Sequence, residues 1–157
     1  MTRSGIGYDL HRLDPGRKLI IGGVEVPFDK GPVGHSDGDV LAHALCDALL
    51  GAAGLGDIGT HFPDSDPQWK GVSSLLFLEQ TRKFLDAKHF NIIHLDAIVI
   101  LERPKLGPHF PAMRQALALS LGVSPDQISL KAKTNEGTGE IGRGEAIAAH
   151  TIATLES

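Results

Sequence analysis

Two groups of side chains near the start of the chain, a pair and a set of three, have the types and spacing that chemistry could use. Asp9 and His11 are separated by one residue, and in a β-strand residues i and i+2 point to the same face. A strand here would therefore place a carboxylate beside an imidazole. Asp39, His43 and Asp47 recur every four residues, the spacing that gives one polar stripe on a helix. If strand and helix pack together, His43 can face the first pair.

Asp9, His11 and His43 then form a candidate metal site. They offer one carboxylate and two imidazoles, and three protein ligands leave one coordination position open. That pattern is typical of catalytic zinc rather than structural zinc. The same spacing also fits two surface histidines beside a capping carboxylate, so both interpretations stand at this point.

The loop from Gly34 to Asp39 could bind an anion. It is rich in small polar residues and leads into a predicted helix N-terminus, where unpaired backbone N–H groups favour negative charge. Asp37 and Asp39 would repel a bare phosphate, so a metal–phosphate site fits better. The alternative is an ordinary capped helix start.

Two later segments have similar ambiguity. Glu136 follows a predicted strand and is a hard oxygen ligand suited to magnesium, and Lys133 or Thr134 could donate to phosphate oxygens. The alternative is a polar turn. Arg143 stands between two glycines, which suits either an anion site or a solvated arginine.

The elements that must position these residues follow from periodicity and turn formers. The pattern predicts a mixture of strands and helices, with the tail read as a strand although its alanines favour helix. Ser36 and Asp39 approximate a capping box for the first helix, and the segment 54–72 reads as a long irregular, functional or mobile loop. The predicted strands are 5–13, a hairpin over 18–27 turning at Gly22-Gly23, 92–101, 127–134 and 145–155; the predicted helices run from Ser36 or Asp37 to about residue 50, over 73–88, and over 109–121 with Gly122 as cap.

These elements predict an α+β (mixed α/β) fold, a small sheet with helices packed on one face. The 157 residues fit one domain, 1–157. A net charge of −4 gives no basic footprint for nucleic acid. No apolar run can span a membrane and the N-terminus has no signal-peptide pattern, so we expect a cytoplasmic protein. The single cysteine, Cys46, excludes an intrachain disulfide and reads as a buried small hydrophobe.

Several well-known fingerprints are missing from the sequence. It has no Gly-x-Gly-x-x-Gly after a strand, no Walker loop, no Gly-x-Ser-x-Gly elbow and no Cys-x-x-Cys. The residues alone therefore indicate metal-dependent phosphate chemistry and no more.

A resemblance adds to this interpretation. Nearly the whole chain resembles the 2-C-methyl-D-erythritol 2,4-cyclodiphosphate synthase family, in motifs that occur in the family's order and spacing. The motifs are 7–11 (GYDLH), 21–23 (IGG), 35–51 (HSDGDVLAHALCDALLG), 56–59 (GDIG), 62–67 (FPDSDP), 104–105 (PK) and 142–145 (GRGE). Lys133, Arg103 and Glu140 depart from the residues common in the family.

The resemblance implies a reaction of the non-mevalonate isoprenoid precursor pathway. 4-Diphosphocytidyl-2-C-methyl-D-erythritol 2-phosphate would be converted to 2-C-methyl-D-erythritol 2,4-cyclodiphosphate with release of CMP, by a phosphorus–oxygen lyase. In such a transfer, positioning and charge neutralisation do most of the catalysis. The family also implies a homotrimer with sites between neighbouring subunits.

The resemblance assigns roles to individual residues. Asp9, His11 and His43 would hold Zn²⁺ or another divalent transition metal, and Glu136 would serve Mg²⁺ or Mn²⁺ on the diphosphate. His35 and Thr134 match residues that stabilise the transition state. The implied substrate-binding residues are Asp9, His11, His35, Ser36, Asp57, Gly59, Phe62, Asp64, Asp66, Leu101, Lys105, Leu106, Ala132, Lys133, Thr134, Glu136 and Arg143.

Two other functions compete with this one. A metal-dependent phosphodiesterase or phosphatase would use the same ligands with water as nucleophile, and its product would be linear. A non-enzymatic trimeric ligand-binding module would keep the fold and lose the ligand residues, all of which are present here.

Overall fold

A five-stranded sheet in the order β4-β1-β7-β5-β6 forms one layer of the protein. The structure is a computed structural model that describes residues 1–157. β1 pairs antiparallel with β4 and β7, β5 pairs antiparallel with β7, and β5 and β6 are parallel. The strands are β1 (Thr2–Pro15), β4 (Lys30–Pro32), β5 (Asn91–Ile100), β6 (Ile128–Lys133) and β7 (Ala146–Glu156).

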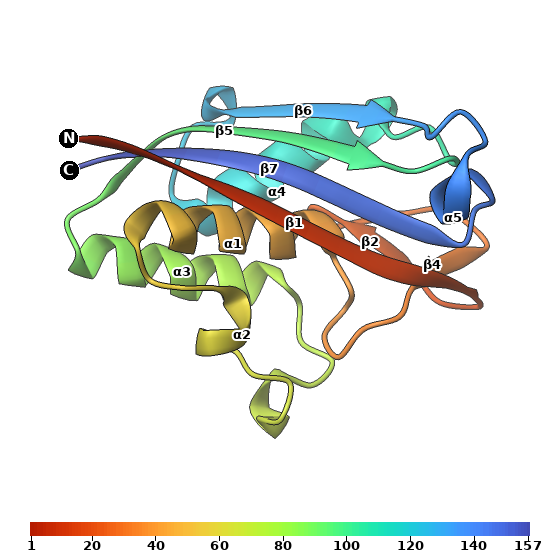
Figure 1. Cartoon of the computed structure of the whole chain (residues 1–157), viewed down its shortest axis with the longest axis horizontal. Coiled ribbons are helices and arrows are strands. Elements are labelled where there is room, and N and C mark those ends of the chain that lie inside the picture. Colours follow the sequence, from red (N-terminus) through yellow and green to blue (C-terminus); the bar gives the residue numbers. More distant parts are fainter.

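Helices form the second layer and leave one face of the sheet uncovered (Figure 1). α1 lies against β1 and β7, α4 reaches β6, and α3 packs on both helices. No helix is long and apolar enough to cross a bilayer. The long helices are α1 (Val40–Ala53), α3 (Leu75–Ala87) and α4 (Phe110–Leu121); the short elements are the hairpin β2 (Leu19–Ile21) and β3 (Val24–Val26), α2 (Ile58–His61), α5 (Gly139–Gly142) and the 3₁₀ turns Pro67–Trp69, Gly107–His109 and Pro125–Gln127.

The predicted mixture of strands and helices is confirmed, including the hairpin and the C-terminal strand. β7 runs the length of β1, and the chain termini meet, with the Met1 amino group 3.1 Å from the Ser157 carbonyl oxygen. The short strand β4 and the short helix α5 were not predicted. The segment 54–72 is less irregular than predicted, because it contains α2 and the turn Pro67–Trp69.

The predicted start of the first helix was wrong by several residues. α1 begins at Val40, and its N-cap is Asp39 rather than Ser36 or Asp37. The Asp39 carboxylate accepts from the Ala42 N–H at 3.0 Å and also from the N–H groups of the Gly22-Gly23 turn, at 2.9 and 2.7 Å. Asp39 is therefore fully buried and does not belong to an exposed polar stripe.

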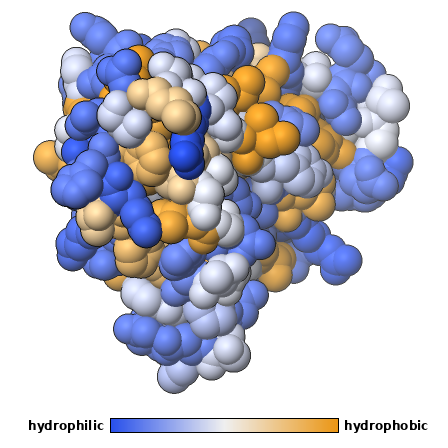
Figure 2. Space-filling model, turned by 60° about the vertical axis from the view of Figure 1, so that its left-hand side comes forward, coloured by the Kyte–Doolittle hydropathy of each residue, from blue (hydrophilic) through white to orange (hydrophobic).

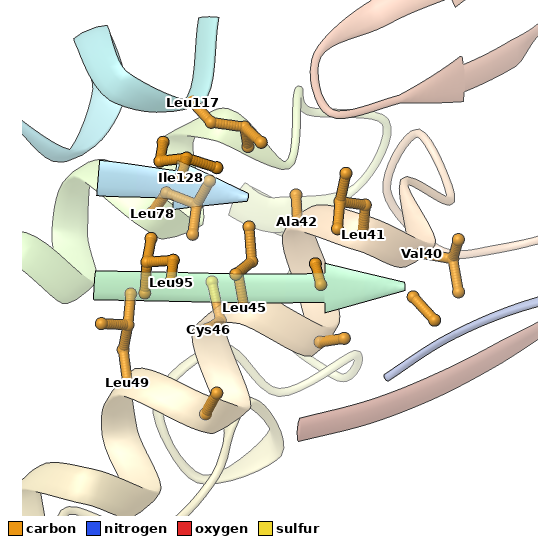
Figure 3. Packing of buried hydrophobic residues seen from close by; sticks show 14 of the residues in the cluster. Val40, Leu41, Ala42, Leu45, Cys46, Leu49, Leu78, Leu95, Leu117 and Ile128 are labelled. Atoms are coloured by element: carbon orange, nitrogen blue, oxygen red, sulfur yellow. The ribbon is translucent and has the colours of Figure 1, made fainter. Parts of the chain in front are cut away.

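The hydrophobic core surrounds α1 on almost every side. Within α1, the only residues that are not buried are His43, Asp47 and Gly51, which form a narrow stripe at four-residue spacing. Figure 3 shows the core around this helix, with side chains from α3, α4, β5 and β6 meeting those of α1. Cys46 lies inside this core, as predicted, and burial raises the pKa of its thiol. A central helix of this kind holds its few polar side chains in fixed places.

Two glycines allow α1 to approach β1 closely. A Cβ atom on Gly7 would stand 1.8 Å from the Ala44 carbonyl oxygen, and one on Gly5 would stand 2.1 Å from that of Ala48. The Ala44 carbonyl is also held by the Thr151 hydroxyl of β7, which donates to it at 2.7 Å. Any larger residue in these two places would push the helix away from the sheet.

We predict that Gly7→Ala destabilises the protein by at least about 3 kcal/mol, because its methyl group would collide with helix backbone that cannot move independently. Gly51→Ala is the matched control. Gly51 lies in the same helix with open space around its Cβ position, so alanine should stabilise by about 0.5–1 kcal/mol. Chemical denaturation measures both. Equal midpoints for Gly7→Ala and the wild type would show that the close approach is not required.

Candidate active site

The three predicted ligand residues converge at the edge of the layer between β1 and α1. The Asp9 Oδ2 atom lies 2.8 Å from His11 Nε2 and 3.0 Å from His43 Nδ1, and the two ring nitrogens are 3.2 Å apart. Asp9 and His11 share the face of β1 that carries Gly5 and Gly7. One carboxylate oxygen and two imidazole nitrogens directed at one point are a donor set that fits a divalent transition metal.

The charges of these residues also suit a cation. Burial disfavours the charged form of Asp9, but hydrogen bonds from His11 and His43 outweigh it and lower the pKa of Asp9 to about 2. Burial likewise opposes protonation of His11, while its hydrogen bond with Asp9 and the negative charge there raise the pKa of His11. The carboxylate is therefore ionised at neutral pH and attracts positive charge to this point.

A hydrogen bond on the side of the ring away from Asp9 fixes the orientation of His11. Its Nδ1 atom lies 2.8 Å from the Val33 carbonyl oxygen, which can only accept. Nδ1 must therefore carry a proton, and Nε2, directed at Asp9 and His43, is the ring nitrogen left to bind a metal. Metal-binding histidines generally have such a partner on the other nitrogen.

A pocket of about 410 Å³ opens beside these three residues. Its aromatic wall is a cluster in which the Phe62 ring centroid lies 4.8 Å from that of Phe77 and 5.2 Å from that of Trp69. Two of its lining residues, His35 and Trp69, have ring nitrogens (Nε2 and Nε1) that are buried without a protein partner, which is unusual for buried polar atoms. The predicted residues that line this pocket are Asp9, His11, His35, Ser36, His43, Gly59, Phe62 and Asp64.

Asp57 and Asp66, two predicted substrate contacts, are helix caps in the structure. The Asp57 carboxylate accepts from the backbone and hydroxyl of Thr60 at the start of α2, and these hydrogen bonds lower the pKa of Asp57. Asp66 accepts from Gln68 at the turn Pro67–Trp69. Neither lines the pocket, so their visible role is to shape the loop that carries Asp64.

A second pocket, of about 370 Å³, lies between the ends of β5 and β6 and the start of α4. It shares no lining residue with the first pocket. The structure therefore splits the predicted site residues of one chain into two groups. The predicted residues in the second group are Leu101, Lys105, Leu106, Ala132, Lys133 and Thr134.

Glu136 and Arg143 lie outside both pockets. Glu136 stands in the loop after β6 with a positive φ of 52°, an uncommon backbone conformation for a residue with a side chain. Arg143 lines a separate groove with Lys30 and Arg103. Its Nε donates to Glu145 at 3.1 Å, and this ion pair raises the pKa of Arg143.

The sequence analysis missed the residue that holds the Glu136 loop. The two oxygens of Glu102 accept from the Asn135 and Gly137 N–H groups, each at 3.1 Å. These contacts bracket Glu136 and support its left-handed backbone. The only signal in the sequence was an acidic residue directly before Arg103 and Pro104, which does not reveal a contact across more than 30 residues.

Ser74 was also missed as a site residue, although the sequence placed it at the start of a helix. Its Oγ atom lies 2.8 Å from His43 Nε2. Asp37 was noted only as an acid in a loop, yet it accepts from the Ser74 hydroxyl and backbone.

Comparisons with known proteins agree on one family. The YgbB family model matches residues 2–156. A 2-C-methyl-D-erythritol 2,4-cyclodiphosphate synthase of Gloeobacter violaceus is 55% identical over 154 residues, covering 98% of this chain and 94% of its own. The enzyme of the same name from Desulfosudis oleivorans is 56% identical over 153 residues, covering 98% and 91%. A solved structure of such a synthase in its CDP-bound form superimposes with a TM-score of 0.90 at 40% identity, covering 98% of this chain and all of that one.

We predict that Glu102→Ala loosens the loop around Glu136. Two backbone N–H groups would lose their acceptor, and at about 1 kcal/mol for each hydrogen bond their amide exchange should quicken about fivefold or more. Hydrogen exchange at Asn135 and Gly137 measures this. Glu140→Ala is the control, since it removes a nearby acid that makes no hydrogen bond to this loop. Unchanged exchange in Glu102→Ala would contradict the bracing role.

Proposed function

The chain belongs to the YgbB family and has the cyclodiphosphate synthase activity of its curated relatives, and from that premise we propose how its residues perform the reaction. The substrate is 4-diphosphocytidyl-2-C-methyl-D-erythritol 2-phosphate. An oxygen of its 2-phosphate forms a bond to the β-phosphorus of the diphosphate, and the bond from that phosphorus to the CMP oxygen breaks. CMP leaves, the cyclic diphosphate remains, and no water is consumed.

The observation that supports this proposal best is the convergence of Asp9, His11 and His43 beside a pocket with unpaired polar atoms. These three residues would hold Zn²⁺ or another divalent transition metal. When bound there, the metal would supply a Lewis acid that polarises a phosphate oxygen and a template that orients it. Catalysis of phosphoryl transfer depends mainly on such charge neutralisation and alignment.

The other residues align and neutralise the two anionic groups. His35 lines the metal pocket and has a buried ring nitrogen without a protein partner, and Thr134 lies in the second pocket beside Lys133; both would stabilise the transition state. Ser36 and Asp64 would contact the methylerythritol part. Lys105 and the other residues of the second pocket would bind the nucleotide and its phosphates. Glu136, held by its braced loop, would serve Mg²⁺ or Mn²⁺ on the diphosphate.

The separation of the two pockets supports a homotrimer. In one chain they share no residue, whereas the substrate must contact both the metal and the nucleotide residues. The uncovered sheet face also carries exposed Ile6, Tyr8, Leu10 and Ile152. Figure 2 shows orange apolar residues reaching the surface in several places among blue hydrophilic ones. Apolar strands exposed in this way favour burial against other copies. The metal pocket of one subunit would then meet the nucleotide pocket of the next.

We predict that His43→Ala loses the metal and the activity together. Removing one of three ligands should weaken zinc binding by orders of magnitude, while the apolar residues of α1 keep the fold. His94→Ala is the control, because His94 is exposed on β5 and its ring forms a hydrogen bond with Ser129 alone. Zinc stoichiometry is measured by elemental analysis and activity by CMP release.

Product analysis separates the synthase from a phosphodiesterase with the same ligands. The wild type should release one CMP for each cyclic diphosphate, even in a vast excess of water. A linear product would favour the hydrolase. Full activity of His43→Ala in metal-free buffer would remove the metal from the mechanism.

Mixed trimers test the shared site. Chains with His43→Ala lack the metal half, and chains with Lys105→Ala lack the nucleotide half, so each variant alone should be inactive. In a random one-to-one mixture about a quarter of the interfaces combine two intact halves, and about a quarter of the wild-type activity should return. The control mixture, His43→Ala with Asp9→Ala, damages the same half twice and should stay inactive. An inactive first mixture of proven trimers would place the whole site in one subunit.

A further inference from the structure

The hydrogen bonds on the far side of the His43 ring surround the candidate metal site and support its ligands. His43 Nε2, on the side of the ring away from Asp9, lies 2.8 Å from Ser74 Oγ and 3.0 Å from Ser36 Oγ. Ser74 is fully buried at the N-terminus of α3. A hydroxyl fixed in the interior makes contacts that are part of the fold rather than of a mobile surface.

The Asp37 carboxylate determines the direction of these hydrogen bonds. It accepts from the backbone N–H of Ser74 and of Asp39, each at 3.0 Å, and it forms a short contact with the Ser74 hydroxyl. A hydroxyl group has one hydrogen to donate. Because Ser74 gives that hydrogen to Asp37, its oxygen can only accept from His43.

This assignment fixes the tautomer of His43. Nε2 must keep a proton, which it donates to Ser74, so Nδ1, directed at Asp9 and His11, is the nitrogen left to give up its proton and bind a metal. A ligand nitrogen must be unprotonated to bind a metal, so the arrangement presets His43 for coordination. The reverse tautomer would put a proton at the metal position.

We propose that Asp37 and Ser74 are positioning residues that fix the tautomer and the ring orientation of His43 for metal binding. The inference rests on the proposed metal role of His43 and adds the two residues through which the fold prepares it. Asp37 belongs to the loop before α1, His43 to α1 and Ser74 to α3. The hydrogen-bonded series Asp37–Ser74–His43, called the relay below, therefore makes the geometry of the metal site depend on the packing of α3 on α1.

His11 and His43 are held in corresponding ways. The Val33 carbonyl oxygen, 2.8 Å from His11 Nδ1, fixes the first ring, and the Ser74–Asp37 pair fixes the second. Ser36 differs from Ser74, because no carboxylate takes its hydrogen. Its hydroxyl can turn toward a ligand in the pocket, which agrees with its proposed contact to substrate.

Zinc affinity tests the relay. Ser74→Ala removes the acceptor of the Nε2 proton, and loss of such an outer contact typically weakens metal binding about 10- to 100-fold. Competition with a chromophoric chelator measures zinc affinity directly and does not depend on activity. Ser73→Ala is the matched control, since Ser73 also stands before α3 and its hydroxyl accepts only from the Leu75 N–H, at 3.3 Å. The zinc affinity of Ser73→Ala should stay within about twofold of the wild-type affinity.

The tautomer can be read in the unaltered protein, which covers the case in which Ser74→Ala does not fold. In ¹⁵N-labelled, metal-free wild type at mildly alkaline pH, long-range proton–nitrogen spectra should show His43 protonated at Nε2. Protonation at Nδ1, or wild-type zinc affinity in folded Ser74→Ala, would overturn the inference. A wild type that binds no zinc would instead refute the proposed metal role, so the two failures are distinguishable.

Discussion

The close contact of α1 with β1 is the constraint on which the rest of the structure depends. Gly5 and Gly7 leave room for the carbonyl oxygens of Ala48 and Ala44, and they occupy the same face of β1 as the next inward residues, Asp9 and His11. The helix that packs on the glycines therefore brings His43 directly over the acidic and basic pair. The metal geometry follows from backbone packing, and the core around α1 holds it in place.

The sequence predicted this convergence because it depends on local periodicity. The two-residue period of a strand placed Asp9 and His11 together, and the four-residue spacing of His43 and Asp47 predicted the polar stripe of α1. Asp39 continued that spacing but is buried as the N-cap. Its partners in the Gly22-Gly23 turn are distant in sequence, and a periodic pattern contains no information about them. The roles of Ser74 and Glu102 were not predicted for the same reason, because their partners are also distant in sequence.

The division of the site into two pockets was expected from the family resemblance, which implies sites between neighbouring subunits, and not from the residues alone. Order along the chain shows that Lys105 and Thr134 are far from Asp9, but chains routinely bring distant residues together. Only the structure shows that they line different pockets. The proposed site would combine the two pockets across subunits, on a unit whose sheet face is left uncovered.

Asp37 and Asp39 occupy the N-terminus of α1, where a phosphate could otherwise bind. The helix N-terminus is already occupied by Asp39, which accepts three backbone N–H groups and whose pKa burial raises to about 6. Asp37 is likewise engaged, by Ser74 and the Asp39 N–H. The chain's own carboxylates therefore take the backbone N–H groups at this helix N-terminus, which favours the metal–phosphate alternative predicted for this loop over a bare anion site. In the proposed function, neutralisation of the substrate would instead come from a cation held by Asp9, His11 and His43 and from the lysines of the second pocket.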